Sequence, residues 1–205
     1  DLTEVAAEKL YITSELAGNE ETDLSEYIKE FGVDVYLKDG RRCKITDSFD
    51  KKDVIGVYGY DNQVIALESK ELQLLDDYSS LPGHPKVIDD LSEAKKDLDG
   101  YGNTKQLKSL GIKSDALDYC EKLGKDWYIP SLGQVKLVAE NMLRINFTLK
   151  HLGKDTLSFS WFWSSTLRSS LFAWDCCSGG YLWCGDFGCN HVYYCSYVLP
   201  FLELS

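Results

Sequence analysis

The sequence has 205 residues, which at ~100 to 200 residues per domain predicts one domain or one domain with an appendage. It is 44% hydrophobic and 27% charged without an apolar run long enough to cross a bilayer, which excludes a disordered chain and predicts no direct membrane insertion. The net charge of -11 predicts that neither nucleic acid nor anionic lipid is a partner, because both are negatively charged. The chain begins with Asp1 instead of Met, as expected where a leader, anchor or upstream segment has been removed.

The N-terminal part of the chain predicts a helical arm. Apolar side chains recur at helical spacing over residues 2–17, and Gly18-Asn19 is a stop signal. A second, short helix follows, in which Asp23 and Glu26 have the spacing of a capping box and Gly32 marks the end. We assign residues 1–32 to this arm, which either packs on its own domain or self-associates with sister chains.

From Val33 the apolar period changes to two, which predicts strands. One pair is expected around the turn Lys38-Asp39-Gly40 and reaches Ile45. The segments 54–60 and 63–69 repeat the pattern around Asp61-Asn62. The first half of the chain therefore predicts four short antiparallel strands.

This pattern ends at Pro82-Gly83-His84-Pro85, and the sequence after it predicts helices. Helices are predicted at 87–97, 103–109, 114–123 and 131–152, the last with a break near Asn141. Ser131 and Gln134 form a second capping box at the start of the last helix. An aromatic, strand-like run ending in FWSST (162–166) follows, so strands and helices are segregated along the chain and the fold class is α+β.

The C-terminal segment differs in composition from the rest. Residues 155–205 hold one Arg and four acidic residues, whereas residues 1–154 hold 21 Lys/Arg and 29 Asp/Glu. Between Arg168 and Tyr197 lie five of the seven cysteines, with many Tyr, Trp, Phe, Gly and Ser and little helical or strand periodicity. Rigid aromatic residues mixed with small, adaptable ones are typical of a paratope, so this segment is expected to present a binding surface.

A series of local motifs supports a resemblance. In chain order they are DLDGYGNT (97–104), DWYIPSLGQ (126–134), RINFTL (144–149), FWSST (162–166), AW (173–174), Gly180 and YVLPF (197–201). Together they resemble the variable proteins of bacterial diversity-generating retroelements, found in gut Bacteroides-like bacteria and their phages. The resemblance covers residues 33–205 and is most specific from Asp126 to Trp174. It implies a C-type lectin-like domain of short antiparallel strands with helices, related in fold to formylglycine-generating enzymes.

In that family an error-prone reverse transcriptase diversifies a C-terminal segment, here about 167–197. The resemblance implies a scaffold made of Trp127, Pro130, Phe162, Trp163, Ser164, Ser165, Trp174 and Gly180. It implies ligand-binding, diversified side chains at Arg168, Leu171, Phe172, Asp175, Cys177, Tyr181, Trp183, Asp186, Phe187, Asn190, His191, Tyr193, Tyr194 and Tyr197. Leu199 stands where the family usually has Arg between Val and Pro, so an ion pair made by that Arg is expected to be missing.

The cysteines leave several readings open. Their spacings fit no common zinc pattern, and Cys176-Cys177 cannot easily bond to each other. Disulfides in an exported chain and free thiols left by diversification both remain possible, whereas Cys43 and Cys120 are expected in the core. Asp97-Leu98-Asp99-Gly100 suggests a calcium loop, but Lys108 stands at the position of its bidentate Glu, so a turn is expected. No metal and no cofactor is predicted.

The resulting functional prediction is a non-catalytic, receptor-binding or adhesin-type protein at the cell surface or outside the cell, or alternatively on a phage virion tail. Its partner would be a protein or another macromolecular ligand. A copper or thiol enzyme related to formylglycine-generating enzymes is the first alternative, and would need a reactive Cys with a base within hydrogen-bond reach. A structural pilin or tail-tip subunit that assembles through the arm is the second alternative.

Overall fold

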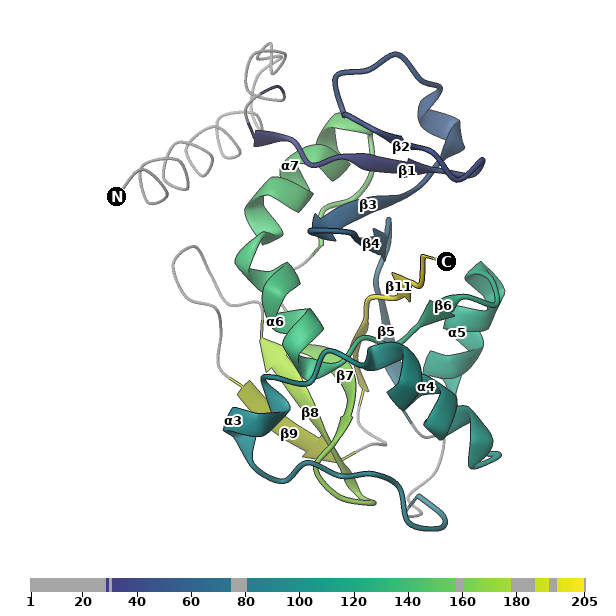
Figure 1. Ribbon diagram of the computed structural model, residues 1–205, viewed down its shortest axis with the longest axis vertical. Helices are drawn as coiled ribbons and strands as arrows, with labels where there is room; N and C mark the ends of the chain where they lie inside the picture. Colours follow the sequence, from purple (N-terminus) through teal and green to yellow (C-terminus); the bar gives the residue numbers. More distant parts are fainter. Residues whose placement is uncertain are drawn as a thin grey trace. The chain divides into compact units, whose positions relative to one another are not determined.

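The computed structural model describes residues 29, 31–74, 81–157, 161–177, 187–191 and 195–204 (Figure 1). The chain forms two compact units. Unit 1 is made from residues 1–68 and 141–157, and unit 2 from residues 69–140 and 158–205. Nearly all of the predicted arm lies outside the described residues, so the arm and its boundary at residue 33 stay predictions.

Unit 1 contains an antiparallel sheet with strand order β2-β1-β3-β4. Its elements are β1 (Val35–Leu37), β2 (Arg42–Cys43), the 3-10 helix η1 (Lys51–Asp53), β3 (Val54–Tyr60), β4 (Gln63–Ala66) and α7 (Met142–His151). The four predicted strands and the turn between the first two are confirmed. Gly40 adopts a φ of 87° in that turn, which a side chain would disfavour.

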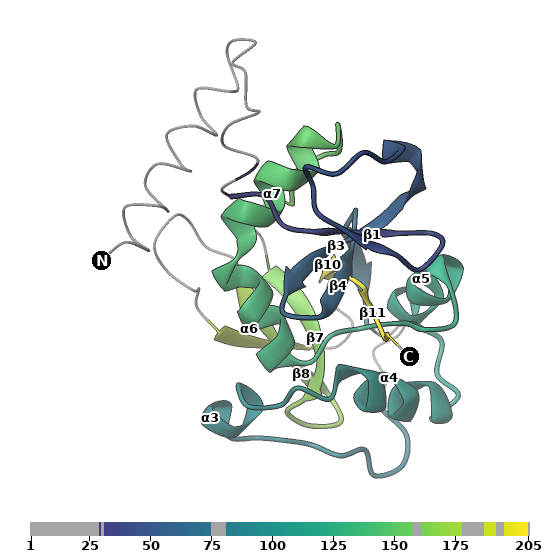
Figure 2. The same cartoon turned by 45° about the horizontal axis from the view of Figure 1, so that its top comes forward.

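Helix α7 packs on β3 of the same unit (Figure 2). Val35, Val57 and Ile65 of the strands are fully buried, together with Ile145 and Leu149, which stand one turn apart on α7. The Thr148 hydroxyl of α7 accepts a hydrogen bond from the Val33 N–H (2.9 Å), and the Lys51 ammonium donates to the His151 carbonyl (2.5 Å). These two contacts connect the C-terminal end of α7 to the segment before β1 and to η1.

Unit 2 contains a five-stranded sheet with strand order β5-β10-β7-β8-β9. Its strands are β5 (Lys70–Gln73), β7 (Trp161–Leu167), β8 (Phe172–Cys177), β9 (Phe187–His191) and β10 (Cys195–Val198), and all neighbours are antiparallel except β10 and β7. A two-stranded pair, β6 (Trp127–Tyr128) with β11 (Phe201–Leu202), belongs to the same unit. The α+β class is therefore confirmed.

The helices of unit 2 are α3 (Leu91–Ala94), α4 (Gly100–Ser109), α5 (Asp115–Leu123) and α6 (Leu132–Glu140). The predicted break near Asn141 is confirmed, since α6 ends at Glu140 and α7 begins at Met142. The predicted helix 87–97 is too long. Asp90 caps a helix of only four residues by accepting from the Glu93 N–H (3.0 Å), and the chain then turns so that Asp97 is buried.

Half of the predicted capping box at Ser131 forms. The Gln134 side-chain oxygen accepts from the Ser131 N–H (3.0 Å), as predicted. The Ser131 hydroxyl instead donates to the Asp97 carbonyl (2.7 Å). Tertiary hydrogen bonding thus replaces the local one, and it ties the start of α6 to the turn before α4.

No helix among the residues that the structure describes is long and apolar enough to cross a membrane.

Candidate functional site

The scaffold predicted for the binding surface is buried. Trp163 has no exposed surface, and the exposed fractions of Phe162 and Trp174 are 2% and 7%. Trp127, Pro130, Ser164 and Ser165 are buried as well, whereas Gly180 lies outside the described residues. These seven positions are therefore buried, as a framework requires.

A buried carboxylate links three of the sequence motifs within unit 2. Asp97 Oδ2 accepts from the Asn103 amide and from the Thr166 hydroxyl, each at 2.7 Å, and Oδ1 accepts from the Asp99 N–H at 3.1 Å. Thr166 Oγ1 also accepts from the Leu132 N–H (2.9 Å). The expected turn at Asp97 is confirmed, and its carboxylate oxygens are used to position β7 and two helix starts.

Strand β7 is fixed to its neighbours by side chains that bond to backbone carbonyls. The Ser164 hydroxyl donates to the Trp174 carbonyl (2.8 Å), and the Ser165 hydroxyl donates to the Pro130 carbonyl (3.1 Å). The Trp163 indole N–H donates to the Leu72 carbonyl (3.1 Å). Because the acceptors are main-chain groups, these bonds do not depend on the side chains of the partner residues.

The turn from β7 to β8 carries the first predicted binding residues, Arg168 and Leu171. The Phe172 carbonyl accepts from the N–H groups of Arg168 (2.8 Å) and Ser169 (3.1 Å), and the Ser169 hydroxyl accepts from the Leu171 N–H (3.1 Å). Sequence reasoning omitted Ser169, whose place between two predicted binding residues was the available signal. The backbone of the turn is therefore specified by short-range bonds.

The segment 81–88 forms backbone hydrogen bonds with this turn. The Leu81 N–H donates to the Ser170 carbonyl and the Ile88 N–H to the Leu167 carbonyl, both at 2.8 Å. The Trp174 indole N–H donates to the Ile88 carbonyl (2.7 Å). A turn supported on both sides can keep its backbone while its side chains vary.

At this turn Arg168 is exposed, and Leu171 and Phe172 are half-buried. The Arg168 guanidinium carbon lies 5.5 Å from the centre of the Trp174 ring, within the range of a cation–π contact. A scaffold residue thus supports an exposed cation next to an aromatic side chain, which suits contact with another macromolecule.

Strand β9 adds backbone positions next to the turn. In the β8–β9 register His191 pairs with Phe172, Asn190 with Ala173, and Phe187 with Cys176 at the other end. Cys177 pairs with Trp161 in the β7–β8 register. Strand pairing therefore places the backbone of Asn190 and His191 beside the end of the turn that carries Arg168, Leu171 and Phe172.

The remaining predicted binding residues fall elsewhere. Asp175, predicted as a binding residue, has no exposed surface, so a ligand on the outside of the unit does not touch it. Tyr197 lies on β10, beyond β7, and its half-buried ring is 6.0 Å from that of Phe162. Five predicted residues lie outside the described residues: Tyr181, Trp183, Asp186, Tyr193 and Tyr194.

Three cysteines are buried and therefore offer little reactivity. Cys43 and Cys120 are buried free thiols, as predicted, and Cys176 is buried. Burial raises the pKa of the Cys120 thiol to about 12, so it stays protonated at neutral pH. Across the described residues no three His, Cys, Asp or Glu side chains gather as metal ligands would.

Comparisons with known proteins give one informative likeness. No family model matches the sequence, and no curated protein matches it significantly. The fold is similar to the crystal structure of a fimbrial protein from Bacteroides ovatus ATCC 8483, with a TM-score of 0.68 and 14% sequence identity. The match covers 84% of this chain and 48% of that one, so this chain spans about half the length of the fimbrial protein.

Proposed function

We propose that this chain is an adhesin-type, ligand-binding module displayed at the cell surface or outside the cell. The likeness to a fimbrial protein supports a surface role, and no helix in the described ranges is suited to span a membrane. The proposed binding surface is the β7–β8 turn with the adjoining strand β9. Its proposed partner is a protein or another macromolecular ligand, bound without catalysis.

The observation that carries this proposal is the separation of framework from contact residues along one strand pair. Ser164, Ser165 and Trp174 are buried and bond to backbone carbonyls, whereas Arg168 is exposed a few residues away. Side chains at the turn can therefore change without removing the bonds that hold the strands. This is the arrangement that a C-type lectin-like scaffold for a diversified surface requires.

Diversification by a retroelement is part of the same proposal. It rests on the motifs that resemble the variable proteins and on the composition of residues 168–197. A near-identical repeat of the coding segment, differing at adenines and located near a reverse-transcriptase gene, would support it. A genome without such a repeat would leave binding in place and remove the diversification.

The binding proposal is tested by varying the turn. In a display library that randomises Arg168, Leu171 and Phe172, most members should keep a cooperative unfolding transition, and some should bind new protein targets. The matched control randomises Ser164, Ser165 and Trp174 and should yield mainly unfolded chains. Similar losses of folding in both libraries would contradict the proposal.

A second candidate is a structural pilin subunit, which the name of the fimbrial relative favours. A purified subunit of this kind should form ordered polymers, visible by electron microscopy and sedimentation. An adhesin-type module should stay monomeric under the same conditions while it binds its ligand.

A further inference from the structure

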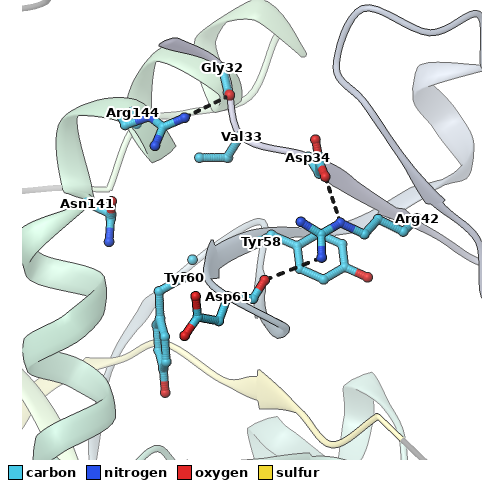
Figure 3. Close-up of a pocket in the computed structure, with 10 residues that line it drawn as sticks. Gly32, Val33, Asp34, Arg42, Tyr58, Tyr60, Asp61, Asn141 and Arg144 are labelled. Carbon is cyan, nitrogen blue, oxygen red and sulfur yellow. Dashed lines mark hydrogen bonds and ion pairs between the residues drawn. The ribbon is translucent and has the colours of Figure 1, made fainter. Parts of the chain in front are cut away.

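Unit 1 contains a cavity of about 300 Å³ that the sequence motifs do not indicate. Its walls come from the segment before β1, from β2, from the end of β3 with the following turn, and from the first turn of α7 (Figure 3). This size is at the lower end of the range found for small-molecule sites. The lining is polar and includes two arginines, two aspartates, an asparagine and two tyrosines.

The first arginine, Arg42, is held on several sides. Its Nε donates to Asp34 Oδ2 (2.6 Å), and its Nη1 donates to Asn62 Oδ1 (3.0 Å). The guanidinium carbon lies 4.0 Å from the centre of the Tyr58 ring. Its charge is therefore balanced by Asp34, and it forms a fixed wall of the cavity.

The second arginine, Arg144, is held only by backbone carbonyls within the described chain. Its Nε donates to the Phe31 carbonyl (3.1 Å) and its Nη2 to the Gly32 carbonyl (3.4 Å). No carboxylate of the described residues pairs with it. A guanidinium carries five N–H donors, so these two bonds orient the group and leave donors for a ligand.

The opposite wall provides a carboxylate and an aromatic ring. Asp61 is exposed in the β3–β4 turn, where its φ is 38°, and Tyr60 is half-buried at the end of β3. Figure 3 shows Tyr60 and Asp61 on the side of the turn, with Asn141 and Arg144 on α7. The cavity thus combines a cation, an anion, an amide and an aromatic ring.

We propose that this cavity binds a hydroxylated monocarboxylate of monosaccharide size, namely a uronic acid residue. The Arg144 guanidinium binds the sugar carboxylate, and Asp61 and Asn141 form hydrogen bonds with its hydroxyl groups. This site belongs to unit 1 and the surface proposed above belongs to unit 2, so neither proposal depends on the other.

The charges favour this class of ligand over two others. A sugar phosphate carries close to two negative charges, and the Asp61 carboxylate would repel the second of them because only one arginine lacks a carboxylate partner in the described chain. A neutral hexose would leave the Arg144 guanidinium without the anion that its fork geometry fits. A ligand with one carboxylate and several hydroxyls pairs its charge with Arg144 and can still donate hydrogen bonds to Asp61.

The experiment is a titration of the full chain, observed by amide NMR, with galacturonic acid, galactose and galactose 6-phosphate. Galacturonic acid should shift the signals of residues 32–34, 58–61 and 141–144 and should bind at least about tenfold more tightly than the other two sugars. Arg144→Gln should reduce its affinity about tenfold or more. Arg41→Gln is the matched control, since Arg41 pairs with Asp39 outside the cavity and should leave the affinity unchanged.

A second variant keeps the proposal testable if Arg144→Gln disturbs the fold. Asp61→Asn keeps a residue type that tolerates the turn conformation and removes the negative charge. It should allow galactose 6-phosphate to bind severalfold more tightly than it binds the unmodified chain. The proposal is overturned if galacturonic acid causes no shifts at millimolar concentration, if galactose binds equally well, or if Asp61→Asn leaves the preference unchanged.

Discussion

Asp97 shows how a single buried side chain supports the proposed surface. It accepts three hydrogen bonds, from Asn103, Thr166 and the Asp99 backbone, which join the motif 97–104 to the motif 162–166. Thr166 in turn accepts from the Leu132 N–H of the motif 126–134. Without Asp97 the buried Asn103 amide and Thr166 hydroxyl would lose this acceptor. When a buried acceptor is removed, the loss of folding stability comes more from the donors left unpaired than from the lost hydrogen bond itself.

We therefore predict that Asp97→Ala lowers the free energy of unfolding by about 3 kcal/mol, measured by urea denaturation. Asp89→Ala is the control, because Asp89 is exposed and should change stability by less than about 0.5 kcal/mol. A small loss for Asp97→Ala would show that water replaces the carboxylate and that the three motifs hold together without it.

Cys120 gives a prediction about pH. Its folded pKa is about 12 because burial disfavours the thiolate, against a reference value of 9.0. As the pH rises above 9, the unfolded chain loses this proton first, so folding stability should fall between pH 9 and about 12. At about pH 10 the loss due to this thiol should be about 1 kcal/mol.

Comparing the chain with Cys120→Ala isolates that contribution, since other groups titrate in both proteins. The difference in unfolding free energy between pH 8 and pH 10 should be smaller in the variant. In the same preparation Cys120 should react with a thiol reagent only after denaturant is added. Rapid reaction of this cysteine in the folded chain would contradict its burial.

At the level of elements, two glycines allow a helix start and a turn to approach closely. A Cβ on Gly100 would lie 2.6 Å from the Ser131 nitrogen and 2.9 Å from the Pro130 carbonyl carbon, and would also meet the Gln134 side chain. A Cβ on Gly133 would lie 2.8 Å from the Lys95 carbonyl oxygen. Backbone atoms cannot move aside as a flexible side chain can.

Gly100→Ala and Gly133→Ala should each lower stability by about 2 kcal/mol in thermal or urea melts. Gly111→Ala is the matched control, because its φ is 65° but no atom lies within 4 Å of an added Cβ. It should cost about 1 kcal/mol through the backbone alone. Equal effects at all three positions would mean that close approach of the elements contributes nothing.

These elements also show what the sequence could and could not predict. The strand predicted over 54–60 is β3 with the same ends, because β-branched and aromatic residues dominate this segment and turn residues follow it at Asp61-Asn62. The helix 87–97 was predicted too long, because the burial of Asp97 depends on Thr166, which is 69 positions away. The cavity was missed for the same reason, since Arg42 and Arg144 are brought together only by the packing of α7.

At the level of the whole molecule, each unit is assembled from two separate stretches of the chain. A fragment that ends at Glu140 has β1 to β4 but lacks α7, and it has β5 without the other four strands of its sheet. We predict that this fragment shows no cooperative thermal transition by near-ultraviolet circular dichroism. A fragment with a melting temperature within a few degrees of the full chain would show that unit 1 is stable without its helix.

The order in which the two units are completed has a consequence for synthesis in the cell. Chains emerge from the ribosome at ~5 to 20 residues per second, N-terminus first. The strands of unit 1 emerge early, but the helix that covers β3 follows only after the whole stretch 69–140. Until then the apolar face of these strands lacks its partner. We therefore expect the nascent chain either to stay unfolded or to be bound by a chaperone until residue 157 has emerged.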